Sequence, residues 1–190
     1  MTSLHCLTLT MITEVKNLAE LRALEINVFA HAHATAQSLV QSAERGIALL
    51  KKLKFERAGL HPLRGTPLNL IEQINQSFTC LVTFEAVRLL FQWHQNKCAG
   101  FKLHIGTASG SDIESIEPGF IAAELFAAVS TGNNKKLSKD IAKVAAVPAQ
   151  HRYVFFHSPA INPGTEPRRL TDREPAGGSV EVWSIGVAEN

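Results

Sequence analysis

The pattern of apolar and polar positions predicts two long helical segments in the first half of the chain. Residues 12–57 carry apolar side chains at helical spacing with no interrupting proline. A second helix is predicted from Pro67 to Gln95, with Thr66 as its N-cap. The Gly- and Pro-containing residues 59–65 form the loop between them. The first half of the chain is therefore expected to be helical on both sides of this loop, with residues 30–37 as a point where the first segment can kink or divide.

From residue 101 onwards the pattern changes to short apolar runs divided by Gly and Pro, which is typical of strands. One further helix is predicted after Asn133 or Asn134, with Pro148 at its end. The predicted strands are 101–106, 111–116, 119–129, 151–158 and 180–187. This order predicts an α/β fold with a mixed sheet flanked by helices.

Length and composition indicate one compact core with an appendage. The chain has 190 residues, of which 45% are hydrophobic, and this is sufficient for a continuous core. We divide it into an N-terminal helical segment, residues 1–65, that packs on an α/β core, residues 66–190. This division follows the change of pattern and the loop that precedes it.

Several classes of protein are excluded by what the chain lacks. No apolar run approaches the roughly 20 residues that span a bilayer, and the N-terminus has no basic region or cleavage site of a secretory signal. The three cysteines are far apart and form no CxxC pair, which argues against a disulfide framework or a zinc site. We therefore expect a cytoplasmic protein that does not enter the membrane.

The formal net charge of +2 conceals an uneven distribution. Residues 51–65 carry a net charge of +4 and residues 130–173 one of +5, whereas residues 66–129 between them carry −3. Scattered surface lysines are one explanation. The other is a carboxylate site for a metal, flanked by side chains that contact phosphates, as in an enzyme that acts on nucleic acid.

Two carboxylates within the predicted sheet are the strongest chemical signal. Asp112 follows the first predicted strand, and Glu124 interrupts the apolar run of residues 119–129. A buried carboxylate is costly unless it is paired, hydrogen-bonded or bound to a cation. We predict that the two lie side by side on one face and bind Mg²⁺ or Mn²⁺. Alternatively, Glu124 pairs with a basic residue across the sheet, and Asp112 only caps a turn.

These residues, in this order, resemble the PD-(D/E)XK nuclease superfamily over about residues 66–158. Asp112, in Ser111-Asp112, stands at the position of the family's Asp, and Glu124 stands at its (D/E) position. Glu72, on the preceding helix, resembles an additional acidic residue that many members carry there. The resemblance implies a restriction-endonuclease-like fold and metal-dependent hydrolysis of DNA, with Asp112 and Glu124 as the metal ligands.

The chain departs from the family pattern at the lysine, whose position is occupied by Phe126. Some members of the superfamily carry this lysine on the following helix. Here that helix offers Lys136, which we favour, and Lys139.

Three functional hypotheses follow. The leading one is a magnesium-dependent nuclease that acts on DNA, with dimerisation through the N-terminal helix as an additional expectation. If neither Lys136 nor Lys139 reaches the site, the same fold would be a catalytically silent module for nucleic-acid binding or assembly. The third is a helical scaffold with an unrelated α/β cap.

Overall fold

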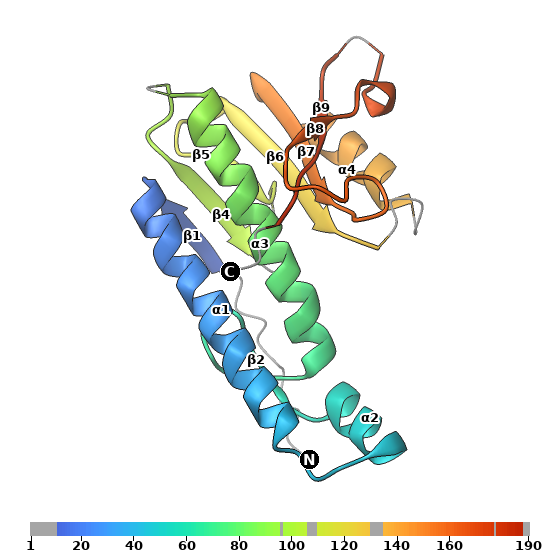
Figure 1. Ribbon diagram of the computed structural model, residues 1–190. Coiled ribbons are helices and arrows are strands. Elements are labelled where there is room, and N and C mark those ends of the chain that lie inside the picture. Colours follow the sequence, from blue (N-terminus) through green and yellow to red (C-terminus); the bar gives the residue numbers. More distant parts are fainter. Residues whose placement is uncertain (1–10, 96, 106–109, 130–134, 177, 188–190) are drawn as a thin grey trace, which may run out of the picture.

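The computed structural model has a seven-stranded mixed sheet with helices on both faces (Figure 1), and it describes residues 11–95, 97–105, 110–129, 135–176 and 178–187. The helices are α1 (Leu18–Val40), α2 (Gly46–Phe55), α3 (Leu70–Trp93) and α4 (Lys136–Ala145), with a short 3-10 turn, η2 (Thr171–Arg173). The strands are β1 (Met11–Val15), β2 (Gly59–Leu60), β3 (Pro67–Leu68), β4 (Phe101–Ile105), β5 (Ile113–Ser115), β6 (Ile121–Ala127), β7 (His151–His157), β8 (Arg168–Arg169) and β9 (Glu181–Ser184).

The strand order of the sheet is β1-β4-β5-β6-β7-β9-β8. Each neighbouring pair in β1-β4-β5-β6 is antiparallel, whereas β7 runs parallel to both β6 and β9. The helix α4 makes the crossover from β6 to β7. The prediction of an α/β fold with a mixed sheet flanked by helices is confirmed.

The sheet separates two hydrophobic cores. On one face, Ala123 and Leu125 of β6 pack with the buried side of α3 and with α1; on the other, Ala122 and Phe126 of the same strand pack with α4. The alternation along β6 follows from the two-residue period of a strand.

Beyond the sheet, α1 and α3 continue side by side to an arm that carries α2 and the β2–β3 hairpin (Figure 1).

The prediction of a helical segment over residues 12–57 is wrong at its start, and the helix divides after Val40 and not at residues 30–37. Residues 11–15 are β1, an edge strand paired with β4, and Val15 is fully buried against the sheet. Asn17 then caps α1 by accepting a hydrogen bond from the backbone N–H of Glu20 at 2.9 Å. Residues 41–45 separate α1 from α2. Five residues are too few for their spacing to distinguish a strand from the first turns of a helix.

The start of the second long helix is also corrected. Asn69, not Thr66, is the N-cap of α3, because its side chain accepts the backbone N–H of Glu72 at 2.9 Å. Pro67 lies in β3 instead of the first helical turn. The predicted caps of the later helix, Asn133 and Asn134, lie outside the described residues. None of the described helices is both long and apolar enough to cross a bilayer.

Candidate functional site

Asp112 and Glu124 lie on the face of the sheet that carries α4. β5 and β6 pair antiparallel, with Ile113 opposite Ala123. Continuing this register by one residue places Asp112 opposite Glu124, and directly opposed residues share a face with their Cβ atoms about 4.5–5.5 Å apart. One Asp112 carboxylate oxygen, Oδ2, accepts the backbone N–H of Leu125 at 2.9 Å. The hydrogen bond holds Asp112 against the strand that carries Glu124.

Glu124 is a buried carboxylate of which only one oxygen accepts a hydrogen bond from a described residue. The residue is 1% exposed, and its Oε2 accepts a hydrogen bond from Lys143 Nζ at 2.7 Å. Its Oε1 is buried without a hydrogen-bond partner among the described residues. Burial raises the pKa of Glu124, and the negative charges of Asp112 and Asp140 raise it further, against the lowering effect of Lys143.

Asp140, on α4, is a second buried carboxylate in the same electrostatic cluster, to which the half-buried Asp112 also belongs. It lies between Leu137 and Val144 on the buried side of the helix and is 3% exposed. Lys136 Nζ donates to its Oδ1 at 2.6 Å, while its Oδ2 has no hydrogen-bond partner in the described part of the chain. Burial raises the pKa of Asp140 as well, and Asp112 adds to the effect. The sequence analysis missed Asp140, although its spacing from Leu137 and Val144 places a carboxylate on an apolar stripe.

The lysine that contacts Glu124 is Lys143 and not either of the two predicted lysines. Lys136 pairs with Asp140 and lies 5.9 Å from the centroid of the Phe126 ring. Lys139 is exposed and makes no ion pair with a described residue. Lys143 is half exposed and forms the ion pair with Glu124.

The direction of α4 explains this difference. Glu124 lies three residues before the end of β6, about 10 Å at the rise of a strand. The crossover helix runs back along the sheet at 1.5 Å per residue, so about seven residues are needed to return to the level of Glu124. Lys143 is seven residues after the first residue of α4, whereas Lys136 is at its start.

Phe126 lies at the edge of the carboxylate cluster, whereas Glu72 lies away from it. Phe126 is 5% exposed and stacks on Phe156, with ring centroids 5.3 Å apart. Beside it lies a cavity of about 310 Å³, to which α3 contributes Thr79 and Thr83, and Asp112 and Lys136 also line it. Glu72 is exposed in the first turn of α3, two turns before Thr79, and does not line this cavity. The structure therefore does not bring Glu72 together with Asp112 and Glu124.

The carboxylate cluster borders a polar and partly open stretch of sheet. α4 packs on β6 and β7, and next to it the same face of β5 and β4 carries Glu114 and His104, whose side chains approach to 3.8 Å. Further out, Ile12 of β1, opposite His104 in the register, is 58% exposed. Glu114 is 37% exposed, whereas the side chain of His104 is 9% exposed, so the carboxylates of Glu124 and Asp140 lie beneath the surface beside this stretch.

The donor set fits a hard divalent cation. The unpartnered oxygens of Glu124 and Asp140 are carboxylate oxygens, the ligands that Mg²⁺ prefers. Within the described residues, no group of three or more His, Cys, Asp or Glu side chains forms a ready-made metal site. Mg²⁺ does not require one, because it usually takes one or two carboxylates together with waters and substrate phosphates.

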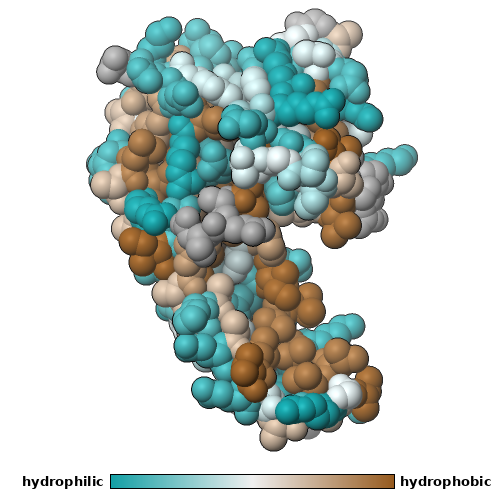
Figure 2. Space-filling model, in the orientation of Figure 1, coloured by the Kyte–Doolittle hydropathy of each residue, from teal (hydrophilic) through white to brown (hydrophobic). Residues whose placement is uncertain are grey.

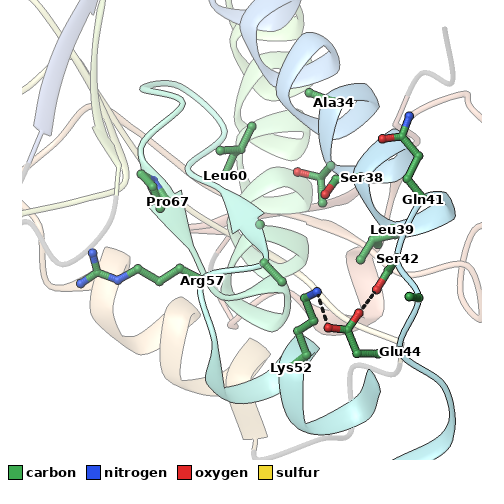
Figure 3. Close-up of a pocket in the computed structure, with 14 residues that line it drawn as sticks. Ala34, Ser38, Leu39, Gln41, Ser42, Glu44, Lys52, Arg57, Leu60 and Pro67 are labelled. Atoms are coloured by element: carbon green, nitrogen blue, oxygen red, sulfur yellow. Dashed lines mark hydrogen bonds and ion pairs between the residues drawn. The ribbon is translucent and has the colours of Figure 1, made fainter. Parts of the chain in front are cut away.

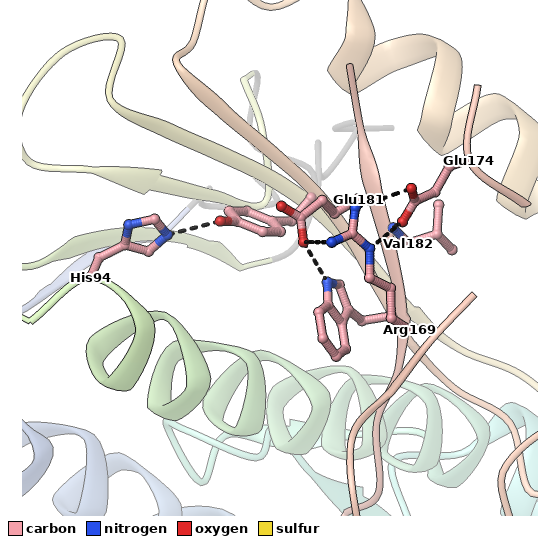
Figure 4. Close-up of polar contacts among 7 residues, drawn as sticks. His94, Arg169, Glu174, Glu181 and Val182 are labelled. Atoms are coloured by element: carbon pink, nitrogen blue, oxygen red, sulfur yellow. Dashed lines mark hydrogen bonds and ion pairs between the residues drawn. The ribbon is translucent and has the colours of Figure 1, made fainter. Parts of the chain in front are cut away.

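A second polar network, on β7, β8 and β9, has a structural explanation (Figure 4). His94 shares a hydrogen bond of 2.8 Å with the Tyr153 hydroxyl. Arg169 Nε lies 2.7 Å from Glu174, and Arg169 also reaches Glu181 at 3.3 Å. These contacts connect the edge strand β8 to the sheet and leave no unsatisfied group for a ligand among the side chains drawn.

No protein-family model, curated protein or solved structure matches this chain.

Proposed function

We propose that this protein is a metal-dependent nuclease that hydrolyses phosphodiester bonds of DNA. The observation that carries the proposal is the pair of buried carboxylates, Glu124 and Asp140, each with one unpartnered oxygen, beside Asp112 and the ammonium group of Lys143. Carboxylates whose pKa values are raised by burial and by neighbouring charges are concentrated at functional sites.

The topology supports the same proposal. α3 precedes the antiparallel strands β4, β5 and β6, and α4 crosses over to the parallel strand β7. This is the order that the resemblance to the PD-(D/E)XK nucleases implies, with Asp112 before the second strand and Glu124 within the third. The resemblance also allows the lysine to come from the helix that follows, where Lys143 lies.

In this mechanism Glu124 and Asp140 would hold the cation through their unpartnered oxygens, and Asp112 would be the third carboxylate ligand. A bound Mg²⁺ would neutralise charge on the scissile phosphate and lower the pKa of an attacking water. Lys143 keeps its ammonium group beside Glu124, where it stabilises the negative charge that develops during hydrolysis.

A catalytically silent nucleic-acid-binding module is the second candidate, and one observation favours it. The ion pair between Lys143 and Glu124 already compensates one of the buried charges, and Phe126 occupies the usual lysine position. In that case Lys143 would substitute for the cation instead of acting beside it.

Cleavage assays separate the two candidates. The purified chain is incubated with supercoiled and linear DNA in Mg²⁺, in Mn²⁺ and in EDTA, together with Glu124→Gln and Lys143→Ala. The nuclease proposal predicts metal-dependent cleavage that each of these substitutions abolishes. Lys139→Ala is the matched control on the same helix and should retain cleavage. DNA binding without cleavage by the wild-type chain would favour the silent module.

A further inference from the structure

The helix α2 has an apolar composition but no buried residue. Six of its ten residues are Ala, Ile, Leu or Phe, and none of the ten is buried. A helix of this composition normally buries an apolar side against the rest of its protein. The neighbouring half of α3 shows the same feature, since Ile71, Ile74 and Phe78 form an exposed stripe at helical spacing.

Together these side chains form one apolar surface, which we call the arm patch. Figure 2 shows hydrophobic residues gathered over the lower part of α3 and over α2, at the concave side of the molecule. α2 packs against α3, and Ile74, Phe78 and Val129 line one cavity of about 400 Å³. The patch consists of Ile47, Leu50, Phe55, Ile71, Ile74, Phe78 and Val129, which are between 43% and 88% exposed.

On the side of the arm opposite the patch, hydrogen bonds hold α3 in place. Gln73, 3% exposed, accepts hydrogen bonds from the Thr35 hydroxyl at 2.9 Å and from the backbone N–H of Leu60 at 2.8 Å. This ties α3 to α1 and to β2. At the end of the arm, Lys52 of α2 pairs with Glu44 at 2.9 Å, beside a cavity of about 570 Å³ (Figure 3). The patch is thus presented on an arm that is held in place by hydrogen bonds.

We propose that the arm patch of one molecule packs against the arm patch of a second copy of this chain. The exposed parts of the seven side chains amount to on the order of 800 Å², the area that each partner buries in an interface of standard size. A typical monomer exposes no apolar patch larger than about 300–600 Å². Two amphipathic helices from each copy would meet in the manner of a four-helix bundle.

The charges at the rim favour a second copy over a partner of a different kind. Lys51 and Lys54 of α2 are exposed, and so is Glu72 of α3, which makes no ion pair with a described residue. In a two-fold contact the same surface occurs on both sides, so a rim with charges of a single sign would repel the rim of the other copy. This rim carries both signs, so the lysines of one copy can face the glutamate of the other.

The test is the oligomeric state of the full chain, measured by light scattering coupled to size-exclusion chromatography over a range of concentrations. The wild-type protein should be a dimer at micromolar concentration. Leu50→Glu combined with Ile74→Glu should raise the dissociation constant at least a hundredfold and give a monomer. Ile47→Asp alone is a second, milder variant with the same expected direction.

The matched control is Ile26→Glu, which introduces the same charge at an exposed apolar position of α1, outside the patch. It should leave the dimer intact, and circular dichroism should show equal helix content in all variants. A wild-type chain that stays monomeric at every concentration would overturn the proposal. So would patch variants that dimerise like the wild type, or a control that dissociates like them.

Discussion

Two glutamates of this protein are equally buried, but the pKa of one is lowered and the pKa of the other is raised. Glu25, on α1, is 2% exposed and accepts hydrogen bonds from Arg22 at 2.5 Å and from Arg88 of α3 at 2.6 Å. Burial opposes its ionisation, but the two arginines outweigh this and lower its pKa. Glu124, 1% exposed, has one lysine and two neighbouring carboxylates, and its pKa is raised.

The comparison shows that burial alone does not identify a functional carboxylate. Both oxygens of Glu25 have partners, so its charge serves to join α1 to α3. One oxygen of Glu124 has no partner among the described residues, so its burial costs free energy that the fold does not recover. Such a cost is expected where a ligand supplies the missing interaction.

The largest expected effect is on stability. Glu25→Gln should lower the free energy of unfolding by about 3 kcal/mol, because it removes one of the two carboxylates, Glu25 and Glu85, that compensate the partly buried guanidinium of Arg88. Glu124→Gln should change it by less than about 1 kcal/mol, since glutamine removes the burial cost and the half-exposed Lys143 returns to water. Urea unfolding followed by circular dichroism measures both. A loss for Glu124→Gln as large as that for Glu25→Gln would contradict the comparison.

Metal binding should give the next largest effect. At about 100 times its dissociation constant, Mg²⁺ or Mn²⁺ should stabilise the wild-type protein by about 2.7 kcal/mol, which raises the Tm by roughly 5–10 °C for a chain of this length. Glu124→Gln and Asp140→Asn should lose this shift, and Glu25→Gln should keep it. A scanning calorimeter with EDTA as the reference gives the measurement. A wild-type Tm that is unaffected by either cation would contradict the metal site.

The pH dependence of stability should differ in sign for the two glutamates. Because the pKa of Glu124 is raised in the folded protein, the folded state binds more protons than the unfolded chain between pH 4.5 and that raised value. Wild-type stability then falls as the pH rises through this window, and Glu124→Gln gains relative to the wild type.

The pKa of Glu25 is lowered, so its stabilising effect is complete above pH 4.5 and disappears as the pH falls through the folded value. The deficit of Glu25→Gln should therefore shrink in acid. Free energies of unfolding measured from pH 3 to pH 8 for the wild type and both variants test this. Parallel profiles for the two variants would show that the two sites do not differ in the way proposed.

The smallest effect on stability is expected for Lys139 of α4. Lys139→Ala should change the free energy of unfolding by less than about 1 kcal/mol, because its side chain is exposed. Lys143→Ala should lower it by more than Lys139→Ala does, because it leaves the buried Glu124 carboxylate without its ammonium partner. Metal binding should remain in both, measured as the Mn²⁺-induced shift in Tm. Only Lys143→Ala should abolish cleavage. If Lys136→Ala or Lys139→Ala abolished cleavage instead, the ion pair with Glu124 would not mark the functional lysine.

The sequence by itself determined β4, β5, β6, α4, β7 and β9 and the relation between Asp112 and Glu124, but not the edge strand β8 or the turn η2. Strand and helix periods are local properties, so they are visible in short windows of sequence. A carboxylate just before one strand of a hairpin-like pair and another within the next strand can be expected to meet, because an antiparallel register is limited by a short connection. The mixed sheet flanked by helices followed from the same local patterns.

Only the tertiary structure decided which charged residues of the helices lie beside Asp112 and Glu124, and which pair elsewhere. Asp140, Lys143 and Glu25 lie at helical spacing like many other charged residues, and their spacing does not say what each helix packs against. The direction in which α4 returns along the sheet brings Lys143 over Glu124, and β1 pairs with β4 across 85 intervening residues of sequence, between Val15 and Phe101. Contacts between distant parts of a chain depend on how whole elements pack, and no local period contains that information.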